Sequence, residues 1–211
     1  MAHHLIYHPV RERREFGETL VYFDQTSGNQ DPYVWSQRFL HSFCHATELR
    51  TPRPGDLNFW VSGDTFPAFT VLHCDLVFEV EEVVTWAAAN SVAKEDGMVD
   101  SAYAYQDHYS WAHQHPFTSK TRRTLKASPV RSFQPQRRDG TLINLISSLD
   151  DLGYSLEEIR TSLRKGFASK PMVLTDAEAM SLYAYIDREA DIRLTGGVLS
   201  KIRATHPELG S

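Results

Sequence analysis

One segment of the chain combines several side chains that could bind a ligand together. In residues 101–138, SAYAYQDHYSWAHQHPFTSKTRRTLKASPVRSFQPQRR, aromatic and histidine residues run directly into basic ones, and no acid follows Asp107. The cations are Lys120, Arg122, Arg123, Lys126, Arg131, Arg137 and Arg138. Guanidinium groups pair with phosphate oxygens, and aromatic rings offer faces on which a nucleobase stacks. The segment predicts a site for a nucleotide or nucleic acid; the alternative is an exposed loop whose charges face water.

The charge of the whole chain limits how such a site would work. The net charge is −5, so removing these seven positive charges leaves −12 for the rest of the chain. Charge is therefore segregated along the sequence. A negative protein with a sequence pI near 6.0 is not expected to coat DNA through bulk charge. We expect any binding of a polyanion to be confined to one local site.

The predicted ligand-binding side chains share three roles. The basic ones would hold phosphate, the aromatic ones would stack on a base, and the histidines and the glutamine would contact its polar edge. Trp60 differs from the others because it lies outside residues 101–138, in a predicted strand. A tryptophan within a strand more often belongs to a core than to a binding site. The predicted residues are Trp60, Tyr105, Tyr109, Trp111, His113, His115, Arg122, Arg123, Lys126 and Gln134.

The same region allows a catalytic alternative. His108, His113 and His115, next to Asp107, could act as a general base or hold a divalent ion during cleavage or modification of a phosphoester compound. A Walker loop, a GxGxxG turn and a GxSxG elbow are all missing from the sequence, so hydrolysis by those routes and dinucleotide redox chemistry lose support. The adjacent carboxylates 81–82 and 150–151 are expected to be solvated, because neighbouring residues of a strand or helix diverge.

A structural metal is a second alternative. His41, Cys44 and His45 have helical spacing, and His73 with Cys74 could complete a zinc site from a strand. Neither CxxC nor HExxH occurs, and such residues commonly pack or hydrogen-bond instead. We therefore expect no resident metal and no cofactor.

The elements that must position these residues differ along the chain. The distribution of apolar residues predicts one or two strands in residues 5–23, with a turn near Gly17. It predicts two more strands in residues 57–61 and 71–84. Residues 33–45 and 86–92 have the spacing of short helices. The segment 101–138 has no clear period and is expected to be loop with strand fragments.

From about residue 141, apolar residues recur at spacings of three and four, which predicts a helical C-terminal third. Ser155 with Glu158 and Thr175 with Glu178 have the spacing of capping boxes, and Gly166 lies where a helix should end. Residues 150–163 also resemble a helix start of MerR-type regulators, although capping explains the same pattern.

Two phrases of the sequence resemble a known group of proteins. PRPGDLNFWVSGD, followed by HCDLVFEVEEVVTWAAA, resembles the PUA-like superfamily of small β barrels, with its EVE, ASCH and YTH domains. It is most similar to the nucleotide-modification-associated domains found beside phage and bacterial base-modification genes. The likeness rests on Gly55-Asp56 before a strand, on the strand 77–84, and on Trp86 after it. The resemblance implies a base pocket at one end of a barrel; the three-aromatic cage of YTH domains is not recognisable here.

These patterns predict an α+β protein, with a PUA-like β barrel in residues 1–140 and a helical extension in residues 141–211 packed on the barrel. The expected function is recognition of a nucleotide or of a nucleobase in nucleic acid, modified or unmodified. The alternatives are an enzyme of nucleotide or nucleic-acid modification or hydrolysis, and a protein-interaction partner within a modification or phage-defence system.

The expected compartment and partners follow from composition. Two cysteines and an N-terminus without a secretory pattern favour the cytoplasm. No apolar run approaches the roughly 20 residues that cross a bilayer, so a membrane partner is not expected. The sequence leaves open whether the protein forms a homo-oligomer, which base is bound, and whether the ligand is free or polymeric.

Overall fold

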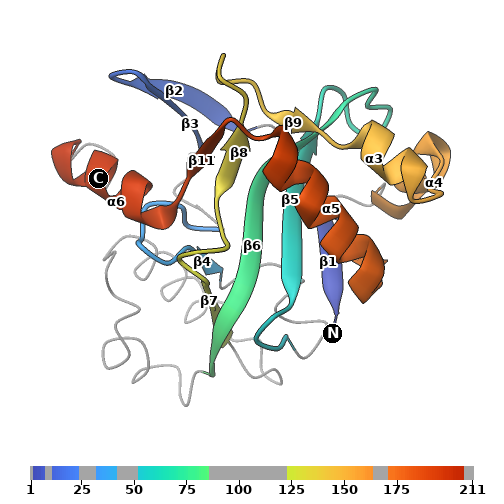
Figure 1. Ribbon diagram of the computed structural model, residues 1–211, viewed down its shortest axis with the longest axis horizontal. Coiled ribbons are helices and arrows are strands. Elements are labelled where there is room, and N and C mark those ends of the chain that lie inside the picture. Colours follow the sequence, from blue (N-terminus) through green and yellow to red (C-terminus); the bar gives the residue numbers. More distant parts are fainter. Residues whose placement is uncertain are drawn as a thin grey trace, which may run out of the picture.

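The computed structural model describes residues 2–7, 11–23, 32–41, 52–85, 123–163 and 171–206. Over these residues the protein is a mixed α+β structure in which helices accompany a mainly antiparallel sheet (Figure 1). The strand order is β10-β1-β5-β6-β7-β4, and β9 also pairs with β6. These strands are β1 (His3–Tyr7), β4 (Leu40–His41), β5 (Leu57–Gly63), β6 (Leu72–Thr85), β7 (Arg123–Ala127), β9 (Ile143–Asn144) and β10 (Met172–Leu174).

The strand β6 organises the sheet because it is 14 residues long. One edge of β6 pairs with β5, and its other edge pairs first with β9 and then with β7. The register shifts at two points, so that Asp75 and Glu81 are extra residues in β6 with no paired residue opposite. Such β-bulges bend a strand and redirect the side chains beside them. The predicted strands 57–61 and 71–84 are confirmed by β5 and β6.

Two smaller strand pairs flank the main sheet. The strands β2 (Glu12–Phe16) and β3 (Thr19–Phe23) form a hairpin, and β8 (Gln134–Gln136) pairs with β11 (Ile192–Leu194). Gly17 has φ of 61° in the hairpin turn, a left-handed conformation that glycine adopts without strain. The predicted turn near Gly17 is therefore confirmed.

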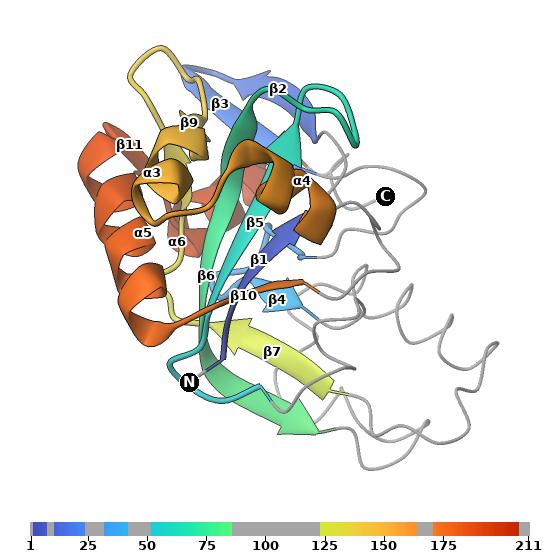
Figure 2. The ribbon, with the colours of Figure 1, turned by 90° about the vertical axis from the view of Figure 1, so that its right-hand side faces the viewer.

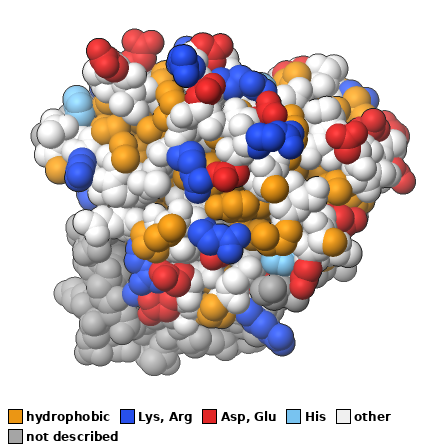
Figure 3. All heavy atoms as spheres, in the orientation of Figure 1, with side chains coloured by type: hydrophobic (Ala, Val, Ile, Leu, Met, Phe, Trp, Pro, Cys, Tyr) orange, Lys and Arg blue, Asp and Glu red, His pale blue; other side chains and the backbone are white. Residues whose placement is uncertain are grey.

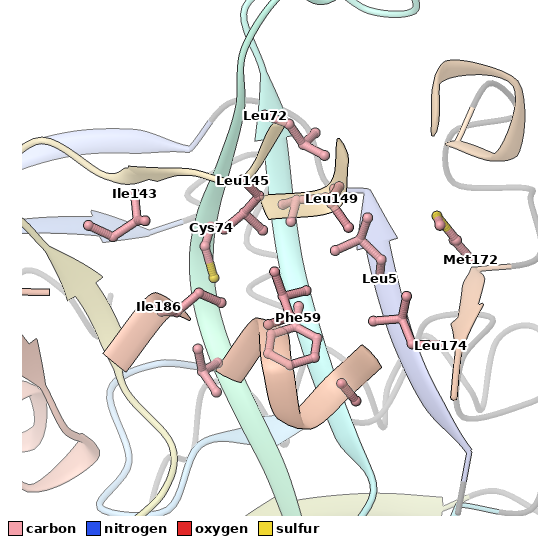
Figure 4. Packing of buried hydrophobic residues seen from close by; sticks show 14 of the residues in the cluster. Leu5, Phe59, Leu72, Cys74, Ile143, Leu145, Leu149, Met172, Leu174 and Ile186 are labelled. Atoms are coloured by element: carbon pink, nitrogen blue, oxygen red, sulfur yellow. The ribbon is translucent and has the colours of Figure 1, made fainter. Parts of the chain in front are cut away.

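The two faces of the sheet are covered by different elements. Figure 2 shows α3 (Ile146–Asp151) and α5 (Asp176–Glu189) on one side of the strands. Between these helices and the sheet lies an apolar core that includes Leu5, Phe59 and Ile186 (Figure 4). A second core contains Trp35, Trp60 and residues of the β2–β3 hairpin. Coverage of both faces explains why all seven residues of β5 are buried.

The C-terminal third is helical in part. It contains α3, α4 (Leu156–Leu163), α5 and α6 (Gly196–Thr205). The capping boxes are confirmed: the Ser155 hydroxyl accepts from the Glu158 N–H at 3.3 Å, and Thr175 with Glu178 forms both bonds of the second box. The prediction missed three short strands, since β9 pairs with β6, β10 pairs with β1 and β11 pairs with β8. Gly166 lies outside the described residues.

A short helix predicted for residues 33–45 is wrong over the residues that the structure describes, 33–41. There Tyr33 and Leu40 form an antiparallel bridge, with N···O distances of 2.7 and 3.1 Å, and the chain continues into β4. Tyr33, Trp35 and Phe39 are all buried in the second core, so burial overrides the helical spacing. The other predicted helix, residues 86–92, lies outside the described residues.

No closed barrel is present in the described part of the chain, where the main sheet is an open path with β10 and β4 at its ends. The α+β class is thus confirmed at the level of helices with a mainly β sheet. Among the described helices, none has the length and apolar character needed to cross a membrane.

Candidate functional site

The two faces of the central strands carry different chemistry. Leu5, Phe59 and Cys74 point into the apolar core beneath the helices. On the opposite side, residues of the second core such as Leu76 and Phe78 are accompanied by polar and ring-bearing side chains of the strands and of Arg11, which precedes β2; all are less than 9% exposed. We call this set the polar face: His4, Arg11, His41, Asn58, Trp60, Ser62 and Asp75. Buried polar groups cost free energy unless they are paired, so seven hydrogen-bonding side chains on one face require explanation.

Strand register brings the first pair of the polar face together. The strands β1 and β5 run parallel with His4 opposite Asn58, and His4 Nδ1 lies 3.1 Å from Asn58 Oδ1. An amide oxygen only accepts hydrogen bonds, so His4 Nδ1 is the donor in this contact. The register of β1 and β5 therefore places an amide and an imidazole side by side in the interior of the protein.

Two rings stand beside this pair. Trp60 follows Asn58 by two residues on the same face of β5, with 1% of its surface exposed. The ring of His41 meets the Trp60 ring edge-on, with centroids 4.7 Å apart and planes at 77°. The centroid of the His41 ring also lies 6.4 Å from that of the Phe78 ring. Edge-to-face contact fixes the orientation of both rings.

A buried ion pair forms the third part of the polar face. The bulge in β6 allows Asp75 to reach Ser62, whose hydroxyl donates to Oδ1 at 2.7 Å. Arg11 Nε lies 3.6 Å from Asp75 Oδ2, and the side chains of both residues have 0% exposure. Removing both charges from water is costly, and their attraction together with hydrogen bonds offsets that cost.

This buried charge affects neighbouring groups. Burial, followed by the negative charge of Asp75, raises the pKa of the Cys74 thiol well above its ordinary value. Cys74 is therefore held as a thiol and is not a nucleophile. Burial is also the main cause that raises the pKa of Tyr7 and Tyr22, with Asp75 adding to both shifts. His73 has a lowered pKa because burial disfavours its charged form.

Four of the predicted binding residues lie in described parts of the chain. Trp60 belongs to the polar face. Gln134 is 0% exposed, and its amide bonds to the backbone of Tyr22. Lys126 is 8% exposed and lies 3.5 Å from Glu82, while Arg123 begins β7 opposite Thr85. The other predicted residues lie outside the described residues: Tyr105, Tyr109, Trp111, His113, His115 and Arg122, together with the catalytic alternative His108.

The structure does locate the ends of the segment that holds those residues. Thr85 at the end of β6 pairs with Arg123 at the start of β7. Residues 86–122 therefore leave and re-enter the sheet at neighbouring positions of two adjacent strands.

Two of the arginines that follow this segment are paired with acids. Arg131 lies 3.0 Å from Glu79, and Arg137 lies 2.9 Å from Glu189. Figure 3 shows basic and acidic side chains interspersed on the face that it displays. Charge that is segregated along the sequence is thus partly balanced in space.

The proposed metal set is not assembled among the residues described. His41 belongs to the polar face, whereas Cys74 lies in the core beneath the helices, so the two cannot share an ion. Within the described ranges no group of three or more His, Cys, Asp or Glu side chains could hold a metal. Cys44, His45 and the histidines of residues 101–122 lie outside those ranges.

The carboxylate pairs behave differently from each other. Asp150 and Asp151 are exposed, as expected. Glu81 and Glu82, which were expected to diverge, both bind Arg38, at 2.8 and 2.9 Å. The bulge at Glu81 explains this difference, because it interrupts the alternation of side chains along the strand.

The sequence-based interpretation missed most of the polar face, namely His4, Arg11, Asn58, Ser62 and Asp75. The sequence does indicate these residues. Asn58, Trp60 and Ser62 occupy alternate positions of the predicted strand that begins at residue 57, and Asp75 is an acid within the apolar strand 71–84. No protein-family model matches the sequence, and no curated protein or solved structure matches it either.

Proposed function

We propose that the protein binds a nucleotide or a nucleobase of nucleic acid, and that the polar face supplies the groups that read the base. The observation that carries this proposal is a cluster of buried polar groups: on the side of the sheet away from the helices, amide, imidazole, hydroxyl and carboxylate groups lie around Trp60, at the border of the second apolar core. The buried Arg11–Asp75 pair within this cluster adds little stability compared with apolar side chains of similar volume, which favours a role beyond packing.

The chemistry of the polar face fits a base better than an apolar ligand. Asn58 and His4 carry the amide and imidazole groups that pair with base edges elsewhere, and the buried rings of Trp60 and His41 pack beside them. Residues 86–122 begin and end beside the same sheet, and they contain Tyr109, Trp111 and Arg122, for which stacking and phosphate contacts remain predictions.

A relationship to the PUA-like group is part of the same proposal. It draws support from the turn before β5, where Asp56 Oδ2 accepts from the Arg53 N–H at 2.8 Å and Asp56 Oδ1 accepts from the Ala2 N–H at 2.9 Å. Gly55 adopts φ of 90°, which the turn requires. The Gly-Asp phrase thus fixes the start of β5 and the position of the N-terminal strand beside it.

A thermal-shift screen with nucleobases, nucleotides and short oligonucleotides, including modified bases, tests the proposal. Selective binding raises the unfolding midpoint by mass action. Asn58→Leu should reduce that shift, because it removes the amide beside His4. Gln136→Met is the matched control: this buried side chain donates to the Leu20 carbonyl in the β8 region, so its loss should affect stability and not the ligand-induced shift.

Two results would contradict the proposal: no shift with any of these compounds, or equal shifts in the wild type and Asn58→Leu. Analysis of the ligand after prolonged incubation separates binding from catalysis. Unchanged ligand supports a binding module, whereas conversion would favour the enzyme alternative, and loss of conversion with a chelator would favour a metal-dependent one.

A further inference from the structure

A buried histidine lies where three elements of the fold begin. His3 is the first residue of β1, Leu57 is the first of β5, and Asp176 is the first of α5. Figure 1 shows the beginning of α5 beside the start of β1. The His3 ring contacts both of the other residues, and His3 is itself only 1% exposed. This ring therefore connects the three elements inside the protein.

One side of the ring fixes its protonation state. His3 Nδ1 lies 2.9 Å from the backbone nitrogen of Leu57, whose N–H can only donate. Nδ1 therefore accepts this hydrogen bond and carries no proton, so the ring is neutral and its proton is on Nε2. A second proton would have to bind at Nδ1. The cationic form of the ring is therefore incompatible with the bond to β5.

The other side of the ring faces acids. His3 Nε2 lies 3.2 Å from Asp176 Oδ1, but the contact lacks the alignment of a hydrogen bond, and this nitrogen has no other partner among the described residues. Glu79 of β6 is close enough to His3 for their charges to interact, and it also forms an ion pair with Arg131. A buried donor without an aligned partner costs free energy, whereas nearby carboxylates favour a cationic imidazole.

The other elements packed beside His3 add no competing charge. Within their described ranges, β5 and β10 contain no ionisable side chain. His4, the next residue of β1, points to the opposite face of the sheet, where it contacts Asn58. The Asp56 carboxylate, which precedes β5, accepts hydrogen bonds from backbone N–H groups, including that of Ala2. The balance at His3 is therefore set by the Leu57 N–H on one side and by two carboxylates on the other.

We infer that His3 is a proton-sensitive switch at the junction of β1, β5 and α5. The neutral ring holds the Leu57 N–H, and the cationic ring releases it and turns toward the carboxylates of Asp176 and Glu79. Histidine is suited to this role because its charge changes near physiological pH. His3 precedes His4 and Leu57 precedes Asn58, so release loosens the backbone that carries the first pair of the polar face.

Nuclear magnetic resonance during an acid titration tests the switch without any ligand. Near neutral pH, proton–nitrogen correlation through the ring should show His3 with its proton on Nε2. As the ring gains its second proton, the Leu57 amide signal should move in step. The protection of this amide from hydrogen exchange should fall by about tenfold, which corresponds to the loss of one hydrogen bond.

His3→Asn and His73→Asn form a matched pair of variants. Asparagine at position 3 keeps an acceptor for the Leu57 N–H and does not titrate, so the Leu57 signal should lose its response to acid. His73 of β6 lies opposite Ser62 near the end of β5, and His73→Asn should keep the response. Asp176→Asn should move the response to lower pH, because it removes a carboxylate that favours the cationic ring.

Three results would overturn the switch: an unchanged Leu57 response in His3→Asn, a second proton on His3 while the Leu57 bond persists, or a ring that stays neutral until the protein unfolds. The last two are read from the wild type alone, so they decide the question even if a variant does not fold. Circular dichroism at each pH monitors the fold. No nucleotide enters these measurements, so failure of the switch and failure of the proposed function are distinguishable.

Discussion

At the scale of single residues, the Arg11–Asp75 pair places the strongest demand on the fold. Both side chains have 0% exposure, and the pair is positioned by a bulge and by the Ser62 hydroxyl. A buried ion pair contributes little net stability compared with apolar residues of similar volume, but loss of one member leaves a charge without its counter-charge. Its value therefore lies in fixing the polar face.

We predict that Asp75→Asn lowers the free energy of unfolding by about 3–5 kcal/mol, because Arg11 keeps a buried charge without its carboxylate. Urea unfolding measures the change. The double variant Arg11→Met with Asp75→Leu should be less destabilised than the single one. Arg38→Met is a control at a partly exposed pair and should cost only about 0–1 kcal/mol. A small effect of Asp75→Asn would contradict this account.

Asp64 provides a prediction for acid stability. Hydrogen bonds from the side chain and backbone of Thr70 are the main causes that lower its pKa from 3.8 to about 2. A lowered carboxyl pKa in the folded state adds stability above the unfolded value, and this stability is lost as pH falls toward 2. In Asp64→Asn, unfolding free energy should fall less steeply between pH 4 and pH 2 than in the wild type. Parallel curves for the two proteins would rule out this role.

At the scale of elements, the close contact of α6 with the chain near Trp35 joins the C-terminal helix to the second core. A Cβ at Gly196 would lie 2.3 Å from the Gln37 carbonyl oxygen and 2.5 Å from that of Ser36. Both atoms belong to the backbone and cannot turn aside as a flexible side chain would. Glycine at the first position of α6 is therefore required by packing.

Gly196→Ala should destabilise the protein by about 1–3 kcal/mol, since the helix must move away from the backbone beneath it. The neighbouring change Gly197→Ala is the matched control. A Cβ there meets only the Thr195 hydroxyl oxygen at 3.8 Å, and alanine favours a helix by up to about 1 kcal/mol. Thermal unfolding of both variants tests the contrast, and similar midpoints for the two would refute it.

At the scale of the whole molecule, folding redistributes the charge that the sequence concentrates in residues 120–138. Lys126, Arg131 and Arg137 each face a glutamate that is distant in sequence. Their positive charge is therefore partly compensated before any ligand binds. The predicted phosphate contacts of Arg122 and Arg123 involve cations that precede these three paired residues in the sequence.

The salt dependence of oligonucleotide binding tests this distribution. Replacing both Arg122 and Arg123 by alanine should weaken binding and reduce the slope of log K against log salt by about 2, that is, by about one for each phosphate contact. Arg137→Ala should leave the slope unchanged, because this cation is already paired with Glu189. An unaltered slope in the double variant would remove the phosphate role of the pair.

The sequence by itself determined the features whose causes are local. The strands β5 and β6, the turn at Gly17 and both capping boxes follow from patterns within a few residues, and all are confirmed. The tertiary structure alone decided that β10 joins β1, that residues 33–41 form a bridge rather than a helix, and that Arg131 meets Glu79. The polar face also depends on pairs distant in sequence, such as His4 with Asn58, separated by 54 positions. Strand register and bulges create such pairs, and short-range periodicity carries no information about them.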